Sequence, residues 1–333
     1  MVVRPSMKFS ILKLKLITII FSSVTLLSAC DPYNRQLMVG AAPWPNFEFL
    51  FLAGELGYLP ENQYSLSELP SSTSVIQAFQ TGKLDVAFLS LDEVLTLVAL
   101  GIDLSIISVI GQSTGGDALL VKPEIKTLED LKWHSIGYEN KAAGALLLNE
   151  IFTLSNLNNQ TLQLFEVKQS EAKDVYMQGH IEGLIVREPE KQQLIQLGAR
   201  ELLNSNVLQH RITHLMVVRQ DILLSKEPQL IYLLKRFYDA YYYYLKKPKD
   251  ALTTIAVRLQ MYPYLLEESF KGAFFIEPKD ALMRLSGFPS NIELKANQLS
   301  QFMTEKNMLG KIPNEFQSII STRILEGVVY AKP

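Results

Sequence analysis

Aromatic and polar residues that could bind a small molecule stand at the starts of two expected helices early in the chain. Pro43-Trp44-Pro45-Asn46 forms a rigid turn whose Trp44 could stack on a ligand or fill the core beneath the loop. Asn46 could cap the following helix or contact the ligand. Ser71-Ser72-Thr73-Ser74 opens the next helix, where hydroxyls and free N–H groups suit an anionic oxygen cluster. Both loops indicate a binding site.

Three further loops carry charged or small residues. Ser90-Leu91-Asp92-Glu93 has capping-box spacing, which explains Glu93 and leaves Asp92 to favour the helix dipole or bind a cationic group. The loop Glu139-Asn140-Lys141-Ala142-Ala143-Gly144 would let a ligand approach a helix start closely. In Arg187-Glu188-Pro189, the arginine could clamp a carboxylate or sulfonate, or pair with a neighbouring glutamate. Proline at the first helical position would make the preceding glutamate the N-cap.

A weak internal repeat at an offset of 97 residues predicts how these loops are positioned. Val39-Gly40 corresponds to Ile136-Gly137, and residues 78–93 align without gaps to residues 175–190. Neither copy needs an insertion. Each copy reads as three strands alternating with three helices, the pattern of a parallel sheet with helices on both faces. Two such lobes would point their matching loops into one cleft.

The remaining chain completes the predicted organisation. His214 to Arg219 reads as another strand, and from Glu227 onward the pattern is almost entirely helical. The chain is expected to cross to the second lobe near Gly115 and return near His214, which makes a two-strand hinge. Residues 37–115 with 214–333 would then form lobe 1, against which the tail packs, and residues 116–213 would form lobe 2.

The first 29 residues read as an export signal, with basic residues followed by an apolar stretch and small residues. Twelve apolar residues are too few for a transmembrane helix, which needs about 20. Leu27-Ser28-Ala29-Cys30 resembles the bacterial lipobox, so we expect lipidation at Cys30, the only cysteine of the chain. A tether over residues 30–36 would follow. Met1 or Met7 could be the start.

Composition narrows the class of partner. The formal net charge is −2, and removal of a leader with four basic residues takes it to about −6. Nucleic acid would favour a basic face, so it is not an expected partner. With one cysteine and no paired histidines on a helix, neither a metal site nor a cofactor is expected. We expect a monomer.

The loops and strands together resemble a known family. Four stretches, WPNFEFLFLAGELGYL, PSSTSVIQAFQTGKLDVAFLSLDE, GGDALLVKPEIKTLEDLK and VREPE, are similar to the substrate-binding proteins of nitrate, sulfonate and taurine ABC importers. That group also includes thiamine-pyrimidine binders. The resemblance covers about residues 37 to 220, whereas the helical tail fits in character only.

This resemblance implies an α/β, type II periplasmic binding protein fold: two doubly wound lobes, a two-strand hinge and a helical C-terminal tail. It implies that the ligand is contacted by Trp44, Asn46, Ser72, Thr73, Asp92, Gly116, Asp117, Asn140 and Glu188. Lys141 joins this set from its loop. Two departures add positive character: His214 stands where many relatives have aspartate, and Arg187 where they have tryptophan.

The predicted function is capture of a small organic anion or zwitterion by a lipid-anchored protein at the periplasmic face of the inner membrane. Its partners would be ABC permease and ATPase subunits. Glu48, Asp92 and Glu188 could meet an ammonium, while the helix starts at Ser72–Ser74 and Asn140–Gly144 meet the acidic end. Alternatively, the protein senses its ligand for a membrane receptor kinase or cyclic-nucleotide enzyme. An enzyme is not expected, because cysteine-using relatives of the fold need residues that this chain lacks.

Overall fold

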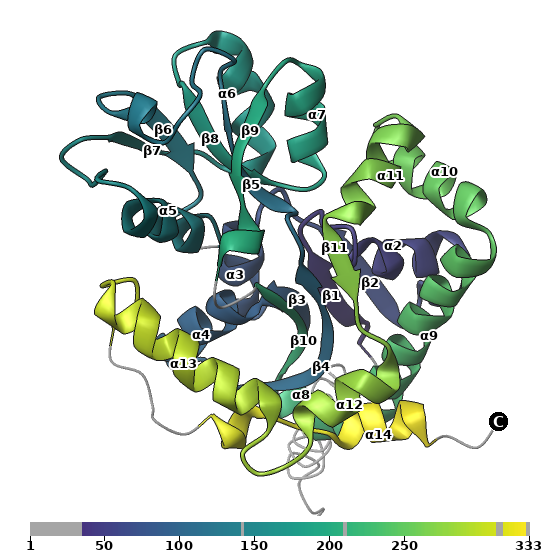
Figure 1. Cartoon of the computed structure of the whole chain (residues 1–333). Helices are drawn as coiled ribbons and strands as arrows, with labels where there is room; N and C mark the ends of the chain where they lie inside the picture. Colours follow the sequence, from purple (N-terminus) through teal and green to yellow (C-terminus); the bar gives the residue numbers. More distant parts are fainter. Residues whose placement is uncertain (1–34, 141–142, 209–211, 311–315, 331–333) are drawn as a thin grey trace, which may run out of the picture. The chain divides into compact units, whose positions relative to one another are not determined.

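A computed structural model describes residues 35–140, 143–208, 212–310 and 316–330 (Figure 1). The expected leader, Cys30 and Lys141 lie outside these residues. The chain divides into a unit over Met1–Gln36 and a unit over Leu37–Pro333. Every helix and strand of the described residues lies in the second unit. In the described part of the chain, no helix combines the length and apolarity needed to cross a membrane.

The second unit contains a six-stranded sheet in the order β11-β4-β10-β3-β1-β2. Its strands are β1 Leu37–Ala41, β2 Tyr64–Glu68, β3 Val86–Ser90, β4 Leu104–Ser113, β10 Thr213–Arg219 and β11 Ala273–Phe275. β1 pairs in parallel with β2 and β3, whereas β10 is antiparallel to both β3 and β4. β3 is buried at every residue, as an apolar central strand covered on both faces should be.

A second, five-stranded sheet has the order β7-β6-β8-β5-β9. Its strands are β5 Asp117–Val121, β6 Ser135–Tyr138, β7 Gln163–Glu166, β8 Gly183–Arg187 and β9 Arg200–Asn204. β6 pairs in parallel with β7 and β8, and β5 lies antiparallel between β8 and β9. The fold is therefore mixed α/β with two sheets, as predicted.

The registers of the strands test the repeat. Val39 pairs with Val86 in the first sheet, and Ile136 pairs with Gly183 in the second, so the offset of 97 holds for the first and third strands of each copy. The second strand differs, because Val39 pairs with Leu66 whereas Ile136 pairs with Leu164, an offset of 98. The prediction that neither copy needs an insertion was therefore wrong by one residue before β7.

Helices cover both sheets and begin where their sequences provide caps. The helices of the two copies are α2 Glu48–Glu55, α3 Ser72–Gln80, α4 Leu91–Ala99, α5 Ala143–Leu154, α6 Ala172–Gln178 and α7 Glu190–Gln196. Ser71 caps α3 by accepting a hydrogen bond from the Ser74 N–H at 3.2 Å. α4 has the predicted capping box, since the Ser90 N–H donates to Glu93 Oε2 at 2.8 Å.

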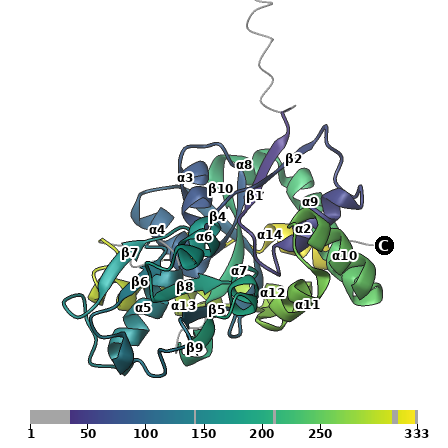
Figure 2. The ribbon, with the colours of Figure 1, turned by 90° about the horizontal axis from the view of Figure 1, so that it is seen from above.

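The C-terminal part is helical except for β11, which the sequence pattern did not predict. Its helices are α8 Gln220–Ser225, α9 Glu227–Lys246, α10 Pro248–Arg258, α11 Pro263–Lys271, α12 Pro278–Leu285, α13 Asn291–Glu305 and α14 Arg323–Val329. Figures 1 and 2 show α9 and α10 beside α2, with α11 next to α10, and α11 also contacts α7 of the second sheet. α13 packs against α4.

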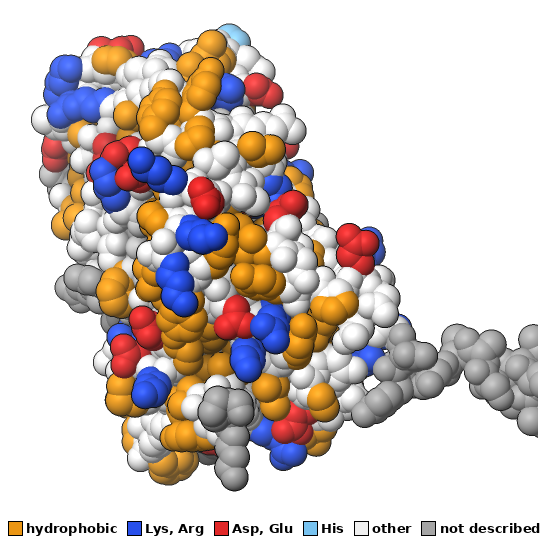
Figure 3. Space-filling model, turned by 90° about the vertical axis from the view of Figure 1, so that its right-hand side faces the viewer, with side chains coloured by type: hydrophobic (Ala, Val, Ile, Leu, Met, Phe, Trp, Pro, Cys, Tyr) orange, Lys and Arg blue, Asp and Glu red, His pale blue; other side chains and the backbone are white. Residues whose placement is uncertain are grey.

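The face that carries α9 to α11 and α14 is chemically mixed. In Figure 3, Lys and Arg side chains alternate with Asp and Glu side chains between small apolar groups. Such a face has no extended basic field of the kind that would attract a nucleic acid backbone.

Candidate functional site

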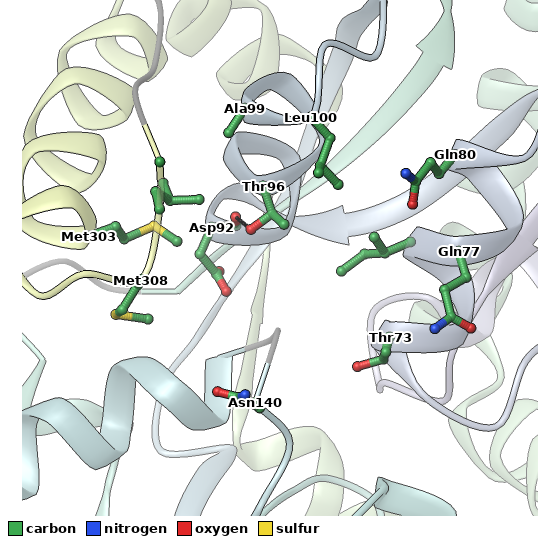
Figure 4. A pocket seen from close by; sticks show the side chains of 13 residues that line it. Thr73, Gln77, Gln80, Asp92, Thr96, Ala99, Leu100, Asn140, Met303 and Met308 are labelled. Atoms are coloured by element: carbon green, nitrogen blue, oxygen red, sulfur yellow. Dashed lines mark hydrogen bonds between the residues drawn. The ribbon is translucent and has the colours of Figure 1, made fainter.

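A cavity of about 330 Å³ lies between the first-sheet helices α3 and α4, the loop after β6 of the second sheet, and the end of α13 (Figure 4). We call it the Asp92 chamber. Its lining consists of Thr73, Ile76, Gln77, Gln80, Asp92, Thr96, Ala99, Leu100, Asn140, Met303, Met308, Leu309 and Gly310. In Figure 4, Met303 and Met308 lie on one side and Gln77 and Gln80 on the other. The chamber is thus built by both sheets and by the tail.

Three predicted ligand contacts, Thr73, Asp92 and Asn140, line this chamber. Asp92 lies in the first turn of α4 and is only 2% exposed. Its Oδ1 and the Thr73 Oγ1 are buried without a hydrogen-bond partner among the described residues. Buried polar atoms nearly always have a partner in native structures, so these two oxygens mark a place where a ligand or water would bind.

Behind Asp92 lies a layer of buried charged groups that joins the two sheets. The Arg187 guanidinium, at the end of β8, interacts electrostatically with Asp92, Glu93, Asp117 and His214. Its Nε and Nη2 have no hydrogen-bond partner in the described part of the chain. This arginine therefore lies among carboxylates, and they include Glu190, one of the two neighbouring glutamates with which the sequence allowed it to pair. The other possibility, a clamp on a ligand carboxylate or sulfonate, stays a prediction.

Burial changes the protonation of this layer. Desolvation raises the pKa of Asp92 to about 6 and that of Glu93 to about 8, while nearby Arg187 opposes both shifts. The pKa of Asp117 is also raised by burial. The pKa of His214 is lowered well below its usual value by burial and by Arg187, so its ring is neutral at pH 7. The positive character expected from His214 is therefore absent at that pH.

Trp44 and Gly116 pack against each other beside this layer and do not line the chamber. Trp44 is fully buried, and its ring centroid lies 4.5 Å from that of His214. A Cβ added at Gly116 would lie 2.4 Å from Trp44 Cη2 and 2.5 Å from the Gly272 carbonyl oxygen. Glycine at position 116 is what permits this approach. Trp44 is therefore packed in the interior in this structure, and its stacking on a ligand stays a prediction.

Asn46 and Glu48, both predicted to contact ligand, are held by the tail. Asn46 Nδ2 donates to the Phe274 carbonyl oxygen on β11 at 2.9 Å. The Glu48 carboxylate pairs with Arg258 at the end of α10, and Arg258 also pairs with Glu68. Glu48 is therefore not available to meet a ligand ammonium in this structure, because a protein cation already occupies that place.

The helix start at Ser72–Ser74 was expected to meet the acidic end of the ligand, and here a protein carboxylate occupies it. Glu139 Oε1, from the loop after β6, accepts a hydrogen bond from the Thr73 backbone N–H at 2.7 Å. A helix N-terminus favours negative charge, and Glu139 supplies it. Ser72 itself is buried and does not line the chamber.

Glu188 lies beside the first crossing, where its backbone N–H donates to the Gly116 carbonyl oxygen at 2.9 Å, and not at the predicted cap. α7 begins at Glu190 with Pro189 as its N-cap residue, so the expected Glu188 cap was one residue too early. Glu188 Oε1 instead accepts a hydrogen bond from Gln192 Nε2 at 2.7 Å, and Lys191 Nζ lies 3.8 Å away. Glu188 Oε2 has no partner among the described residues. Burial raises the pKa of Glu188 to about 7.

Comparisons with known proteins agree with this architecture. A family model described as "NMT1/THI5 like" matches residues 44–251, more than half of the chain. The chain belongs to this family. No curated protein matches the chain by sequence alone.

Solved structures share the fold of this NMT1/THI5-like chain at low sequence identity. The alkanesulfonate-binding protein SsuA from Xanthomonas axonopodis pv. citri, bound to MOPS, has a TM-score of 0.74 and 16% identity and covers 86% of this chain and 98% of its own. The aliphatic sulphonate-binding SsuA from Escherichia coli has a TM-score of 0.68 and 16% identity, covering 85% and 91%. The nitrate-binding protein NrtA from Synechocystis PCC 6803 has a TM-score of 0.68 and 10% identity, covering 89% of each chain.

Sequence reasoning missed the tail wall and the Glu139 contact. Met303, Met308 and Leu309 were not considered, because the repeat that predicted the loops does not extend to them. The segment MTEKNML carries a signal, because its apolar residues continue past Glu305, where α13 ends. Met308 Sδ also lies 3.4 Å from Asn149 Nδ2 on α5, so this wall contacts both halves of the chamber.

Proposed function

We propose that this chain is the extracytoplasmic solute-binding component of an ABC importer and that its ligand, a small organic molecule, binds in the Asp92 chamber. Family membership supports the class of protein. The observation that carries the site is that Asp92 and Thr73 present buried, unpartnered oxygens to a cavity that Asn140 closes from the second sheet. Binding, with no catalytic step, is the role proposed.

The proposed mechanism is closure of two lobes, residues 37–115 with 214–333 and residues 116–213, around the ligand. A ligand that touches Asp92 and Asn140 at once gains both contacts only when the lobes are together. Such a ligand shifts the population toward the closed state by its differential affinity. The crossing segments near Gly115 and Thr213 would act as the hinge. Ser113 Oγ and Ser205 Oγ, 2.8 Å apart, join the two crossings in this structure.

Calorimetry with the purified protein tests ligand binding. The panel consists of taurine, alkanesulfonates, nitrate and pyrimidines, chosen to cover the anion, zwitterion and thiamine-pyrimidine classes. Binding of any member should decrease the radius of gyration measured by X-ray scattering. Mass spectrometry of protein purified from its native host adds ligands that the panel lacks. Absence of binding across the panel, together with a ligand-free native preparation, would overturn the proposed function.

The proposal includes a membrane anchor and a role in transport. We place the protein at the periplasmic face of the inner membrane, held by a lipid on Cys30 and working as a monomer with permease and ATPase subunits. A Cys30→Ser variant should move from the membrane fraction to the soluble extracytoplasmic fraction, and the lipid mass should disappear from the N-terminal peptide. Ligand-loaded protein should stimulate ATP hydrolysis by the reconstituted transporter; failure to do so would contradict the importer role.

A further inference from the structure

The chemistry of the Asp92 chamber restricts the class of ligand. Among its described lining residues, Asp92 is the one with a formal charge, and Lys, Arg and His are absent. Arg187, the cation of the buried layer, does not line the chamber. A sulfonate or nitrate placed here would face a carboxylate, and the described residues of the lining supply no cation to offset the repulsion.

The start of α3, which would also suit an anion, is already occupied by a carboxylate of the protein. The backbone N–H of Thr73 at the start of α3 donates to Glu139 Oε1 at 2.7 Å. An anionic ligand at this helix start would have to displace that carboxylate and leave it buried, since Glu139 is 6% exposed. What remains free is an acceptor pair, Asp92 Oδ1 and Thr73 Oγ1, of which the hydroxyl can also donate.

The lining of the chamber also provides apolar surface. Six of its thirteen residues have apolar side chains: Ile76, Ala99, Leu100, Met303, Met308 and Leu309. Methionine side chains are flexible and polarizable, so they adjust to apolar groups of different shape. The uncharged polar residues of the lining, Gln77, Gln80, Thr96 and Asn140, can bind neutral polar groups.

We propose that the ligand is a small amine with an apolar body, whose amino group donates to Asp92 and whose body packs against Met303 on α13 and Met308 just beyond its end. This inference rests on the proposed function and names the substrate class of the same site. A protonated amine offers the donors that the free carboxylate oxygen lacks and offsets its buried charge. The apolar body gains from leaving water, which a bare inorganic anion would not.

Calorimetry with matched probes at pH 7.5 tests the proposal. The probes are the linear amines from propylamine to hexylamine, butane-1-sulfonate, and 3-aminopropane-1-sulfonate. We expect the amines to bind, with affinity rising about fourfold for each added methylene that enters the chamber. Butane-1-sulfonate should bind more weakly than butylamine by at least tenfold. Equal or tighter binding of the sulfonate would overturn the inference.

Two variants keep the test specific. Asp92→Asn removes the charge while keeping the shape, and it should weaken amine binding at least tenfold. Asp280→Asn is the matched control, because Asp280 also lies in the first turn of a helix, α12, but is exposed. Leu100→Trp narrows the chamber at a residue that is 54% exposed, so its folding cost is small. It should remove the gain from longer amines. Unchanged affinities in both variants would overturn the inference.

The outcomes also separate this inference from the function on which it rests. Binding of a sulfonate, nitrate or pyrimidine with no binding of the amines would leave a solute-binding protein and overturn the amine class. Absence of binding by every probe, with no ligand in the native preparation, would overturn both.

Discussion

Glu139 Oε1 accepts a hydrogen bond of 2.7 Å from the backbone N–H of Thr73, and this contact joins the loop after β6 to the start of α3. Glu139 follows β6 of the second sheet, whereas α3, which carries Thr73, packs against β1 and β3 of the first sheet. The carboxylate takes the place that a ligand oxyanion could take, because both satisfy the same helix N-terminus. The protein itself therefore stabilises the contact between this loop and the start of α3.

Neutralising Glu139 should loosen that contact. In Glu139→Gln, an uncharged acceptor replaces a charged one, so we expect hydrogen exchange at the Thr73 amide to accelerate about tenfold in the ligand-free protein. Exchange followed by NMR or mass spectrometry measures this. Glu166→Gln, which changes an exposed carboxylate on β7, is the control. Equal protection in both variants would mean that the hydrogen bond does not form in solution.

Glu48 should matter for stability and not for ligand affinity. Its carboxylate is buried against Arg258, which also pairs with Glu68. In Glu48→Gln, Arg258 loses one of these two carboxylate partners and keeps Glu68. We expect the free energy of unfolding to fall by about 1–3 kcal/mol. Denaturant titration measures the loss, and Glu55→Gln, an exposed change on the same helix, is the control. A weakened ligand affinity with unchanged stability would restore Glu48 to the binding site.

The buried carboxyl groups predict how stability depends on pH. Desolvation raises the pKa of Glu93 to about 8 and those of Glu188 and Glu190 to about 7. The folded state then holds these protons more tightly than the unfolded chain. Their contribution to stability is fully present below about pH 4 and is lost as pH rises through their folded pKa values.

We therefore expect the thermal midpoint of the ligand-free protein to fall between pH 6 and pH 8.5. Glu93→Gln should flatten the upper part of this decrease, because the neutral amide cannot titrate beside Asp92 and Arg187. Calorimetry at several pH values measures it. Glu293→Gln is a matched control, since Glu293 holds the same capping-box position in α13 but is partly exposed. An equal slope in all three proteins would contradict the assignment to Glu93.

Gly116 should tolerate no side chain. A Cβ there would meet Trp44 Cη2 at 2.4 Å and the Gly272 carbonyl oxygen at 2.5 Å, and backbone cannot move aside cheaply. We expect Gly116→Ala to lower the free energy of unfolding by about 1–3 kcal/mol. Gly310→Ala, where an added Cβ meets nothing within 4 Å, should be close to neutral. Denaturant titration of both variants decides the question.

Local and periodic signals predicted much of the fold. The Ser90 and Glu93 capping box depends on residues three apart, and the repeat depends on equal strand registers, so both are visible in a linear sequence. The one-residue shift at β7 was not visible, because a short loop absorbs it without changing the apolar pattern. Patterns of period two and 3.6 locate elements better than they locate loop lengths.

The candidate site was less predictable because its partners are distant in the chain. Asn46 binds a carbonyl 228 residues away, and Glu48 pairs with an arginine 210 residues away, so each seemed free for a ligand. Arg187 was predicted either to clamp a ligand carboxylate or sulfonate or to pair with a neighbouring glutamate, and nothing in the sequence indicated that burial also places it beside the distant Asp92 and Asp117. Thr73, Asp92 and Asn140 line one cavity, and their loops could be located because they follow from strand order alone, whereas their contact with a ligand stays a prediction.

Met303, on α13, and Met308, just beyond its end, lie outside both copies of the repeat. Substitutions at Met303 or Met308 would change the lining of the chamber at positions that belong to neither sheet. Ligand specificity can therefore change during evolution without a change in the two repeated sheets. We expect related chains with the same two sheets to differ in ligand specificity first through the residues at the end of α13.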